Sequence, residues 1–310
     1  MQDAAPVLVM TALFLGGTVS LAAEAPLPVP VPVTGSGVTG TVLRYPALAS
    51  QHVTARNVDV WLPSGYTSDD GRRYPVLYMH DGQNVFDPAT AYGNVDWGVD
   101  ETMTRLVAAG AVRPAIVVAV WSSPRRREEF MPQRAVRGPL RFNVPGAADA
   151  QPSDIISDRY LAFLVQELKP LIDANYRTLQ GRADTFIMGS SMAGLISQYA
   201  MSRYPDVFGG AGCVSTHWPA GDGIALDDFA AHLPDPAAHK YWFDFGTATL
   251  DASYEPYQRR ADEILRKAGY VEGRNWITKK FEGAEHSERA WRLRVDQALV
   301  FLIGHCKETH

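Results

Sequence analysis

The chain has 310 residues, of which 46% are hydrophobic and 20% are charged, values that are ordinary for a globular protein with a sizeable core. Its formal net charge of -5 argues against a nucleic-acid partner, because proteins that bind nucleic acids present a broad basic surface. The dense basic run Arg125–Arg127 is interpreted as a solvated loop. A chain of this length is compatible with a single α/β domain.

The N-terminus has the pattern of an export signal. Residues 5–23 are almost free of charge and end in small residues, which predicts a secretory signal peptide cleaved near Ala23 or Ala25. A basic segment before the apolar run is missing, so a lipid-facing anchor or a wrongly assigned start stays open. We therefore predict that residues 1–25 are a signal peptide. The mature protein is then expected to be periplasmic or extracellular, without stable membrane insertion.

Residues 26–38 are rich in proline and then in glycine, which predicts an extended linker before a domain that spans 39–310. The two cysteines, Cys213 and Cys306, allow one disulfide but do not require it. No Cys-x-x-Cys or clustered Cys/His spacing is present, so no metal site is predicted.

Apolar patterns along the domain predict strands and helices in alternation. The predicted strands are Val53–Leu62, Tyr74–Met79, Ala115–Trp121, Thr185–Met188, Gly210–Ser215, Tyr241–Phe245 and Trp276–Phe281. The predicted helices are Val99–Ala109, a segment from Ser153 to Leu171 that Pro170 should interrupt, Met192–Arg203, Glu255–Ala268 and Ser287–Ile303. Apolar central strands indicate a mostly parallel sheet with helices on both faces. On such sheets, ligand chemistry lies at the carboxyl ends of the strands.

The segment 186–194 carries the strongest functional motif. A short apolar run breaks into Gly-x-Ser-x-Ala at residues 189–193, and a helical pattern follows directly. This order of strand, sharp turn and helix is the context of a nucleophile elbow, with Ser191 as the candidate nucleophile. The alternative is a glycine-serine turn that merely joins a strand to a helix.

A serine nucleophile needs a base to accept its proton, and in this arrangement the acid and then the histidine follow the serine in the chain. His286 lies directly after the last predicted strand and before the final helix, where the sheet edge would present it beside the elbow. His217 lies near another strand end and is the second candidate. A structural role remains the alternative for either histidine.

The acid is expected in the turn after the strand Tyr241–Phe245. Asp251 lies there, although an aspartate in that position can equally serve as a helix N-cap. Asp244 lies within the strand, and Asp262 is expected on a helix surface, so Asp251 is preferred.

An oxyanion hole requires two backbone donors. The residue after the serine, Met192, is the first candidate. The second is expected from the turn His80–Gln83, with Gly82 preferred because glycine lets the backbone approach a ligand closely.

Three motifs in the right order, Tyr74–Asp87, Met188–Ser197 and Gly283–Glu288, resemble the Putative esterase family, which is similar to esterase D, feruloyl, acetyl xylan and enterochelin esterases and to the mycolyltransferase antigens. The resemblance runs from about Val42 to Leu302. It implies an α/β-hydrolase fold, a Ser–Asp–His triad and no cofactor. It assigns the nucleophile to Ser191 and the base to His286, while Ala193 departs from the glycine usual in the family.

The segment Trp121–Pro152 has no clear period and predicts a binding loop. Within it, Arg125 is a candidate for an anionic group of the substrate. Three tryptophans are candidates for an aromatic wall around a sugar or phenolic acyl group, with core packing as the alternative for each: Trp97, Trp121 and Trp218.

These features favour an exported serine ester hydrolase acting on a small or carbohydrate-linked ester of the acetyl or feruloyl type. Two alternatives stay open. One is acyl transfer of the mycolyltransferase type, in which an alcohol takes the place of water. The other is a non-catalytic binding module, because a fold does not by itself establish activity.

Overall fold

The protein is described from a computed structural model, which covers residue 1 and residues 28–35, 37–67 and 71–305. The predicted signal peptide and Cys306 lie outside the described residues. Nine strands form one sheet in the order β1-β2-β3-β5-β4-β6-β7-β8-β9. The strands are β1 (Val31–Pro32), β2 (Thr41–Leu48), β3 (Arg56–Leu62), β4 (Val76–His80), β5 (Ile116–Val120), β6 (Thr185–Ser190), β7 (Gly210–Val214), β8 (Lys240–Gly246) and β9 (Trp276–Phe281).

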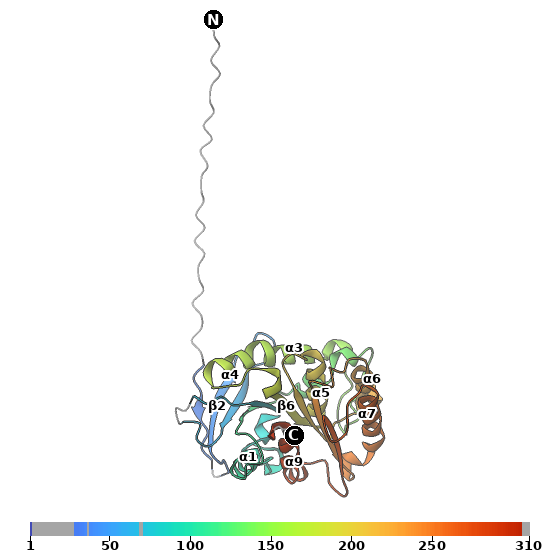
Figure 1. The fold of residues 1–310 in the computed structure, drawn as a ribbon. Coiled ribbons are helices and arrows are strands. Elements are labelled where there is room, and N and C mark those ends of the chain that lie inside the picture. The colour runs from blue at the N-terminus through green and yellow to red at the C-terminus, as the bar shows by residue number, and fades with distance from the viewer. Residues whose placement is uncertain (2–27, 36, 68–70, 306–310) are drawn as a thin grey trace.

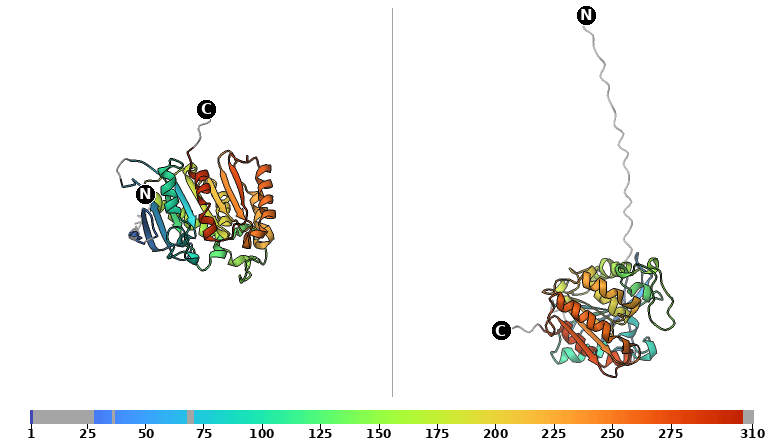
Figure 2. Two further views of the ribbon diagram at one scale, coloured as in Figure 1. Left: turned by 90° about the horizontal axis from the view of Figure 1, so that it is seen from below. Right: turned by 90° about the vertical axis from the view of Figure 1, so that its right-hand side faces the viewer.

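The sheet is antiparallel at its N-terminal edge and parallel elsewhere. The pairs from β1 to β5 run antiparallel, whereas β5, β4, β6, β7, β8 and β9 run parallel to one another. Figure 2 shows the N-terminal strands in blue at one end of the sheet and α7 (Glu255–Lys267) in orange at the other. The carboxyl ends of six strands therefore meet along one edge.

Helices cover both faces of this sheet, as predicted. In Figure 1, α3 (Ser157–Ala162) and α4 (Lys169–Asn175) lie on one side, and α1 (Val99–Ala108) and α9 (Val295–Ile303) lie on the other. The remaining helices are α2 (Arg126–Phe130), α5 (Met192–Arg203), α6 (Ile224–Ala231), α7 and α8 (Glu288–Arg292).

The core is divided into two layers by the sheet. In β5 the side chains alternate: Ile116 and Val118 pack in the layer beneath α3 and α5, and Val117 and Ala119 pack in the layer beneath α1 and α9. All four are fully buried, which explains why a parallel central strand reads as a continuous apolar run. This rigid core holds the strand ends from which the site is built.

Two helical segments are interrupted. Between α3 and α4, residues Phe163–Leu168 form a π-helix that ends just before Pro170. The predicted interruption is thus present, because proline lacks an N–H and its ring crowds the preceding turn. The predicted helix Ser287–Ile303 is divided into α8 and α9 at Leu293–Arg294, where the Arg294 guanidinium turns inward to Asp244.

Part of the segment predicted as a linker pairs with the domain. Val31 and Pro32 form β1 and pair with Arg44 and Leu43 of β2. Cys213 lies fully buried in β7. Among the described residues, no helix has the length and apolar character to cross a membrane.

Candidate active site

Ser191 occupies a strained turn between β6 and α5. Its backbone has φ 60° and ψ -122°, an uncommon conformation for a residue with a side chain. Its residual exposure is 9%. The helix that begins at Met192 directs its first N–H groups, which lack intrahelical acceptors, toward this end of the strand. The turn therefore combines an accessible hydroxyl with free backbone donors.

The turn depends on glycine at position 189. A Cβ placed there would lie 2.5 Å from the Ala193 Cβ, a distance that real side chains do not reach. Ala193 stands where the family that this chain resembles usually has glycine. Its side chain is fully buried and lies beside Gly189. The alanine is accommodated because the facing residue is glycine.

His286 and Asp251 are joined by a short hydrogen bond. His286 Nδ1 lies 2.6 Å from Asp251 Oδ1, and the backbone N–H of His286 donates to Thr249 Oγ1 at 2.8 Å. A carboxylate only accepts, so Nδ1 carries the proton and Nε2 is left as the basic nitrogen of the neutral ring. Both residues come from loops after parallel strands, β9 for His286 and β8 for Asp251.

The second oxygen of Asp251 is held by two donors. Ser215 Oγ and the backbone N–H of Gly246 each donate to Asp251 Oδ2 at 2.6 Å. Burial acts to raise the pKa of Asp251, but the bonds from His286, Ser215 and Gly246 outweigh it, so the pKa of this carboxyl is lowered. The arrangement keeps Asp251 ionised while it is almost fully buried.

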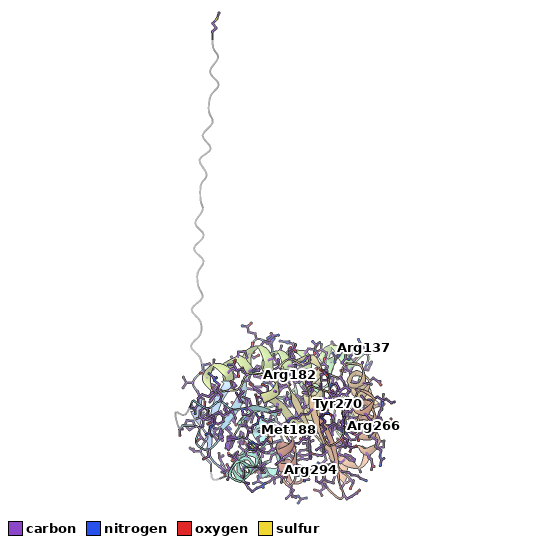
Figure 3. The ribbon with its side chains drawn as sticks, in the orientation of Figure 1. Arg137, Arg182, Met188, Arg266, Tyr270 and Arg294 are labelled. Carbon is purple, nitrogen blue, oxygen red and sulfur yellow. The ribbon has the colours of Figure 1, made fainter. Side chains whose placement is uncertain are left out.

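A buried arginine, Arg294, holds Ser215 in position. Arg294 donates to Ser215 Oγ at 2.8 Å and to Asp244 Oδ1 at 3.0 Å, and its exposed fraction is 3%. Figure 3 labels Arg294 on the lower side of the molecule, where Figure 1 labels α9. Burial raises the pKa of Asp244 even though Arg294 acts against it. Removing either partner would leave a buried charge uncompensated.

Two aromatic rings flank the imidazole of His286. Trp291 meets it edge-on at 4.9 Å between ring centroids, and Tyr254 meets it edge-on at 5.7 Å. The indole Nε1 of Trp291 also donates to Ser215 Oγ at 3.0 Å. These contacts restrict the orientation of the ring.

His217, the second candidate base, is fully buried, and both of its ring nitrogens have hydrogen-bond partners. Its Nε2 donates to the backbone oxygen of Phe142 at 2.5 Å, so its Nδ1 accepts from the Tyr254 hydroxyl at 2.6 Å. Burial raises the pKa of Tyr254, and the nearby Ser191 side chain acts in the opposite direction. Burial lowers the pKa of His217 to about 4, which keeps the ring neutral. The His217 ring is thus engaged by Phe142 and Tyr254, while its backbone N–H donates to the carbonyl oxygen of Ser191 at 3.1 Å.

Ser191 and His286 share one cavity of about 380 Å³. Its other lining residues come from the segment after β4, the loop after β5, the turn between β6 and α5, the loop after β8, and α8, and they include both charged and apolar side chains. They are Asp81, Gln83, Asn84, Tyr92, Arg126, Arg127, Val144, Ser190, Met192, Leu250, Glu288 and Trp291. The segment predicted as a binding loop, Trp121–Pro152, thus supplies three of the lining residues: Arg126, Arg127 and Val144.

Arg126 is anchored at the edge of the cavity. Its guanidinium donates two hydrogen bonds of 2.6 Å to the carboxylate of Asp81, whose backbone adopts a left-handed conformation with φ 54°. This bidentate pair ties the loop after β5 to the turn after β4. Arg127 also lines the cavity, and it is exposed.

The residues predicted to bind substrate do not line this cavity. Arg125 donates to the backbone oxygen of Asp154 at 2.9 Å. Trp97 packs behind the cavity against Trp291 at 5.5 Å, and Trp121 donates to Asp59 at the β3 edge. Trp218 is fully buried and donates to Gln258. The core-packing alternative describes Trp97 and Trp218 well, because both are almost inaccessible.

The predicted oxyanion donors are placed differently from each other. Met192 lines the cavity beside Ser191. Gly82 is buried against β5, where an added Cβ would lie 2.6 Å from the Ala119 backbone. Its neighbour Gln83 lines the cavity, and the Gln83 side chain is held by two hydrogen bonds to Ser122.

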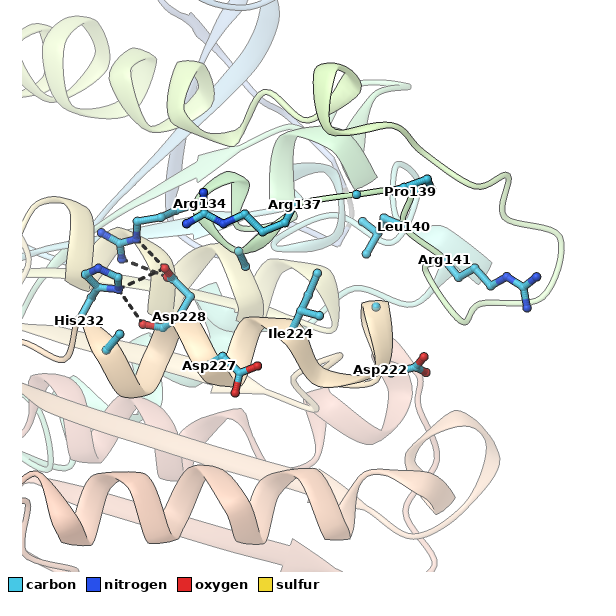
Figure 4. Close-up of a pocket in the computed structure, with 14 residues that line it drawn as sticks. Arg134, Arg137, Pro139, Leu140, Arg141, Asp222, Ile224, Asp227, Asp228 and His232 are labelled. Atoms are coloured by element: carbon cyan, nitrogen blue, oxygen red, sulfur yellow. Dashed lines mark hydrogen bonds and ion pairs between the residues drawn. The ribbon is translucent and has the colours of Figure 1, made fainter.

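A larger cavity of about 680 Å³ lies beside α6, apart from Ser191 and His286. Figure 4 shows its walls: the loop carrying Arg137 and Arg141 on one side and α6 with Asp227 on the other. An ion pair between Arg134 and Asp228 closes one end. The smaller cavity is the candidate active site because the nucleophile turn and the His286–Asp251 pair converge there.

Sequence reasoning missed four residues that surround the pair: Ser215, Tyr254, Trp291 and Arg294. Ser215 directly follows β7, and a polar residue at the carboxyl end of a parallel strand is a signal that could have been used. The other three lie on or beside helices, and only the fold brings them to His286 or Asp251.

Comparisons with known proteins agree with this architecture. Residues 51–302 match the family model described as Putative esterase. An uncharacterized protein of Bacillus subtilis, YbbA, is 24% identical over 85% of this chain and 98% of its own length. An endo-1,4-beta-xylanase/feruloyl esterase of Xylanibacter ruminicola is 25% identical over 76% of this chain. The matched part is 28% of the length of that protein.

The fold of this chain is similar to those of several solved structures. A ferulic acid esterase from Anaeromyces mucronatus superposes with a TM-score of 0.60 at 20% identity, covering 87% of this chain and 92% of that one. The enterobactin esterase of Shigella flexneri superposes with a TM-score of 0.58 at 20% identity, covering 82% of this chain and 57% of that one. The fold is thus of the α/β-hydrolase type, and because the family model spans most of the chain, the protein belongs to the Putative esterase family and is an ester hydrolase.

Proposed function

We propose that the protein is a serine carboxylic ester hydrolase in which Ser191, His286 and Asp251 form the catalytic triad. One observation supports this proposal above the others. The bond between His286 Nδ1 and Asp251 leaves Nε2 basic in the same cavity that the strained Ser191 turn lines. A serine hydroxyl becomes a nucleophile when such an oriented base removes its proton.

In the proposed reaction, Ser191 Oγ attacks the ester carbonyl while His286 Nε2 accepts the hydroxyl proton. Asp251 stabilises the imidazolium that forms, and His286 then returns the proton to the leaving alcohol. The resulting acyl-enzyme is hydrolysed by water that His286 activates in turn. The bonds from Ser215 and Gly246 hold Asp251 in the orientation that this cycle requires.

The oxyanion of the tetrahedral intermediate is assigned to two backbone N–H groups. Met192 supplies one, because it begins α5 directly after the nucleophile. The turn after β4 supplies the other, and Gln83 is better placed for this than Gly82 because Gln83 lines the cavity. Each such donor contributes on the order of 3 kcal/mol to transition-state stabilisation.

The proposed substrate is a small or carbohydrate-linked ester of the acetyl or feruloyl type. The cavity of about 380 Å³ fits an acyl group of modest size, and its mixed lining of charged and apolar side chains suits a small ester that carries polar substituents. The similarity to a feruloyl esterase and to solved ferulic acid esterases favours this class. We further propose that the mature enzyme is exported, as the apolar N-terminal segment predicts.

Labelling with a fluorophosphonate tests this proposal without knowledge of the substrate. We expect one covalent adduct, located on Ser191 by peptide mass mapping, and loss of labelling in His286→Ala. His52→Ala, which changes a partly exposed histidine outside the cavity, is the matched control and should label like wild type. Absence of labelling in folded wild-type protein would contradict the proposal and favour a non-catalytic module.

The hydroxyl of Tyr254 is expected to contribute to both stability and turnover. Tyr254→Phe leaves the buried Nδ1 of His217 without its donor, which should lower the free energy of unfolding by about 1–3 kcal/mol. Because the hydroxyl also lies near the Ser191 side chain, kcat should fall about tenfold with little change in KM. Urea unfolding and steady-state kinetics measure the two effects.

Tyr257→Phe is the control for this prediction, because Tyr257 lies in the same helix and is only partly buried. Equal stability and equal kcat in Tyr254→Phe and wild type would contradict the assigned contacts. Loss of stability with unchanged kcat would restrict Tyr254 to a structural role.

A further inference from the structure

Three carboxylates gather at the start of α1, outside the site described above. Asp96 lies in the preceding loop, and Asp100 and Glu101 lie in the first turn of the helix. One ligand oxygen from each lies within 4.8 Å of the others. Asp96 and Asp100 are buried, and Glu101 is partly buried. Such a concentration of negative charge is costly to bury unless it is compensated.

Two oxygens in this cluster are left without a partner. Asp100 Oδ2 accepts from the backbone N–H of Thr39 at 2.6 Å, but Asp100 Oδ1 has no partner although the residue is 0% exposed. Glu101 Oε1 accepts from Arg292, but the buried Glu101 Oε2 has no partner. The carboxyl groups of Asp100 and Glu101 also interact with each other, so Asp100 faces into the cluster.

Arg292 compensates part of the charge. Its guanidinium donates to Asp96 Oδ1 at 2.6 Å and to Glu101 Oε1 at 3.2 Å, while Asp100 has no ion-pair partner among the described residues. The backbone N–H of Gly98 donates to the other oxygen of Asp96 at 2.7 Å. Burial, together with the neighbouring Glu101 carboxyl, raises the pKa of Asp100 to about 8. With all three carboxyls ionised, the cluster and this one guanidinium carry a formal charge of -2, which one divalent cation neutralises.

We propose that Asp96, Asp100 and Glu101 form a structural binding site for a divalent cation of the Ca²⁺ class. The donor set is made only of carboxylate oxygens, which select hard cations. Ca²⁺ suits it better than Mg²⁺, because Ca²⁺ accepts irregular geometry whereas Mg²⁺ demands a near-ideal octahedron and retains several waters. The unpartnered oxygens of Asp100 and Glu101 are the principal ligands, and water completes the coordination.

The position of the site gives the cation a mechanical role. Through Thr39 it connects to the segment before β2, and through Arg292 it connects to α8. Trp291, the neighbour of Arg292, packs against Trp97 on one side and His286 on the other. A bound cation would therefore fasten α8, and with it the wall of the cavity that contacts His286.

Thermal unfolding of the chelator-treated full chain tests the proposal independently of any ester hydrolysis. Saturating Ca²⁺ is expected to raise the Tm of wild type by about 5 °C, with a smaller rise for Mg²⁺. Tb³⁺ should bind at the same place and show luminescence sensitised by tryptophan, with Ca²⁺ displacing it. Asp100→Asn should abolish the Tm rise and reduce Tb³⁺ binding at least tenfold.

Asp206→Asn, which changes a carboxylate with 97% side-chain exposure, is the matched control and should respond to Ca²⁺ like wild type. Glu101→Gln serves as a second variant if Asp100→Asn does not fold. The proposal is overturned if millimolar Ca²⁺ leaves the wild-type Tm unchanged, because a shared proton would then satisfy the two oxygens. An equal Tm rise in wild type and both cluster variants would place the cation elsewhere and also overturn it.

Discussion

Replacement of Ser191 by alanine is expected to lower kcat for a short chromogenic ester such as p-nitrophenyl acetate by on the order of 10⁶-fold. Removing the hydroxyl removes the nucleophile, so no acyl-enzyme forms, and only binding and the backbone donors continue to act on the substrate. Stability should change little, because the turn is held by the backbone and by the packing of Gly189 against Ala193. Steady-state kinetics with a urea unfolding curve measures both quantities.

Ser190→Ala is the informative control, because this serine immediately precedes the nucleophile in the same turn. It is expected to keep kcat within about tenfold of wild type, since its hydroxyl has no role in the proposed reaction. If Ser190→Ala lost activity and Ser191→Ala retained it, the nucleophile would be misassigned.

Product analysis in the presence of a sugar acceptor separates the two acyl-enzyme outcomes: free acid indicates hydrolysis, and acylated sugar indicates transfer.

Replacement of Asp251 by asparagine is expected to lower kcat about 10⁴-fold while KM changes little. The amide retains the shape of the carboxylate, but it removes the charge that stabilises the imidazolium. It also permits the His286 proton to move to Nε2, the nitrogen that must accept the Ser191 proton. A proton NMR resonance of the hydrogen-bonded Nδ1–H in wild type, lost in the variant, would report this change directly.

Asp262→Asn is the matched control, because Asp262 is one of the two aspartates weighed against Asp251 and lies on α7. It accepts from Thr278 and Gln258 and does not line the cavity around Ser191, so its replacement should leave kcat near the wild-type value. Equal losses in the two variants would contradict the assignment of the acid.

The lowered pKa of Asp251 also has a consequence for stability. A carboxyl whose pKa is lower in the folded than in the unfolded protein stabilises the fold at pH above its unfolded value, and this contribution is lost as the pH falls through the folded value. Asp251→Asn should therefore flatten the acid side of the stability profile relative to wild type. The same comparison with Asp262→Asn, where burial raises the pKa, should not show this flattening.

Local patterns in the sequence were sufficient for most elements. The predicted bounds of β9 and α5 agree with the structure, and the interruption before Pro170 is present. Each of these depends on neighbours a few residues apart: an apolar run, a turn followed by a helical pattern, or a missing N–H. The break at Leu293–Arg294 was not predicted, because it depends on the contact between Arg294 and Asp244, 50 residues earlier.

The candidate site likewise combines residues that the sequence can select with residues that only tertiary packing can place. Chain order and position at strand ends selected Ser191, Asp251 and His286 as candidates. The structure pairs His286 with Asp251 and gives His286 and Ser191 a common cavity, since parallel strands bring their carboxyl ends to one edge. The tryptophans carried no comparable signal. An indole suits a sugar site and a buried core equally well, and only packing shows that Trp218 lies between Phe229 and Phe243.

By itself, the sequence determined the α/β architecture, the sharp turn at Ser191 and the order of the candidate acid and base along the chain, because these follow from short-range patterns and from topology. The tertiary structure decided which side chains hold the pair in place and which line the cavity. Ser215 reaches Asp251 across 36 residues, and Arg294 reaches Ser215 across 79. Such contacts are set by how whole layers pack, and no local pattern encodes that packing.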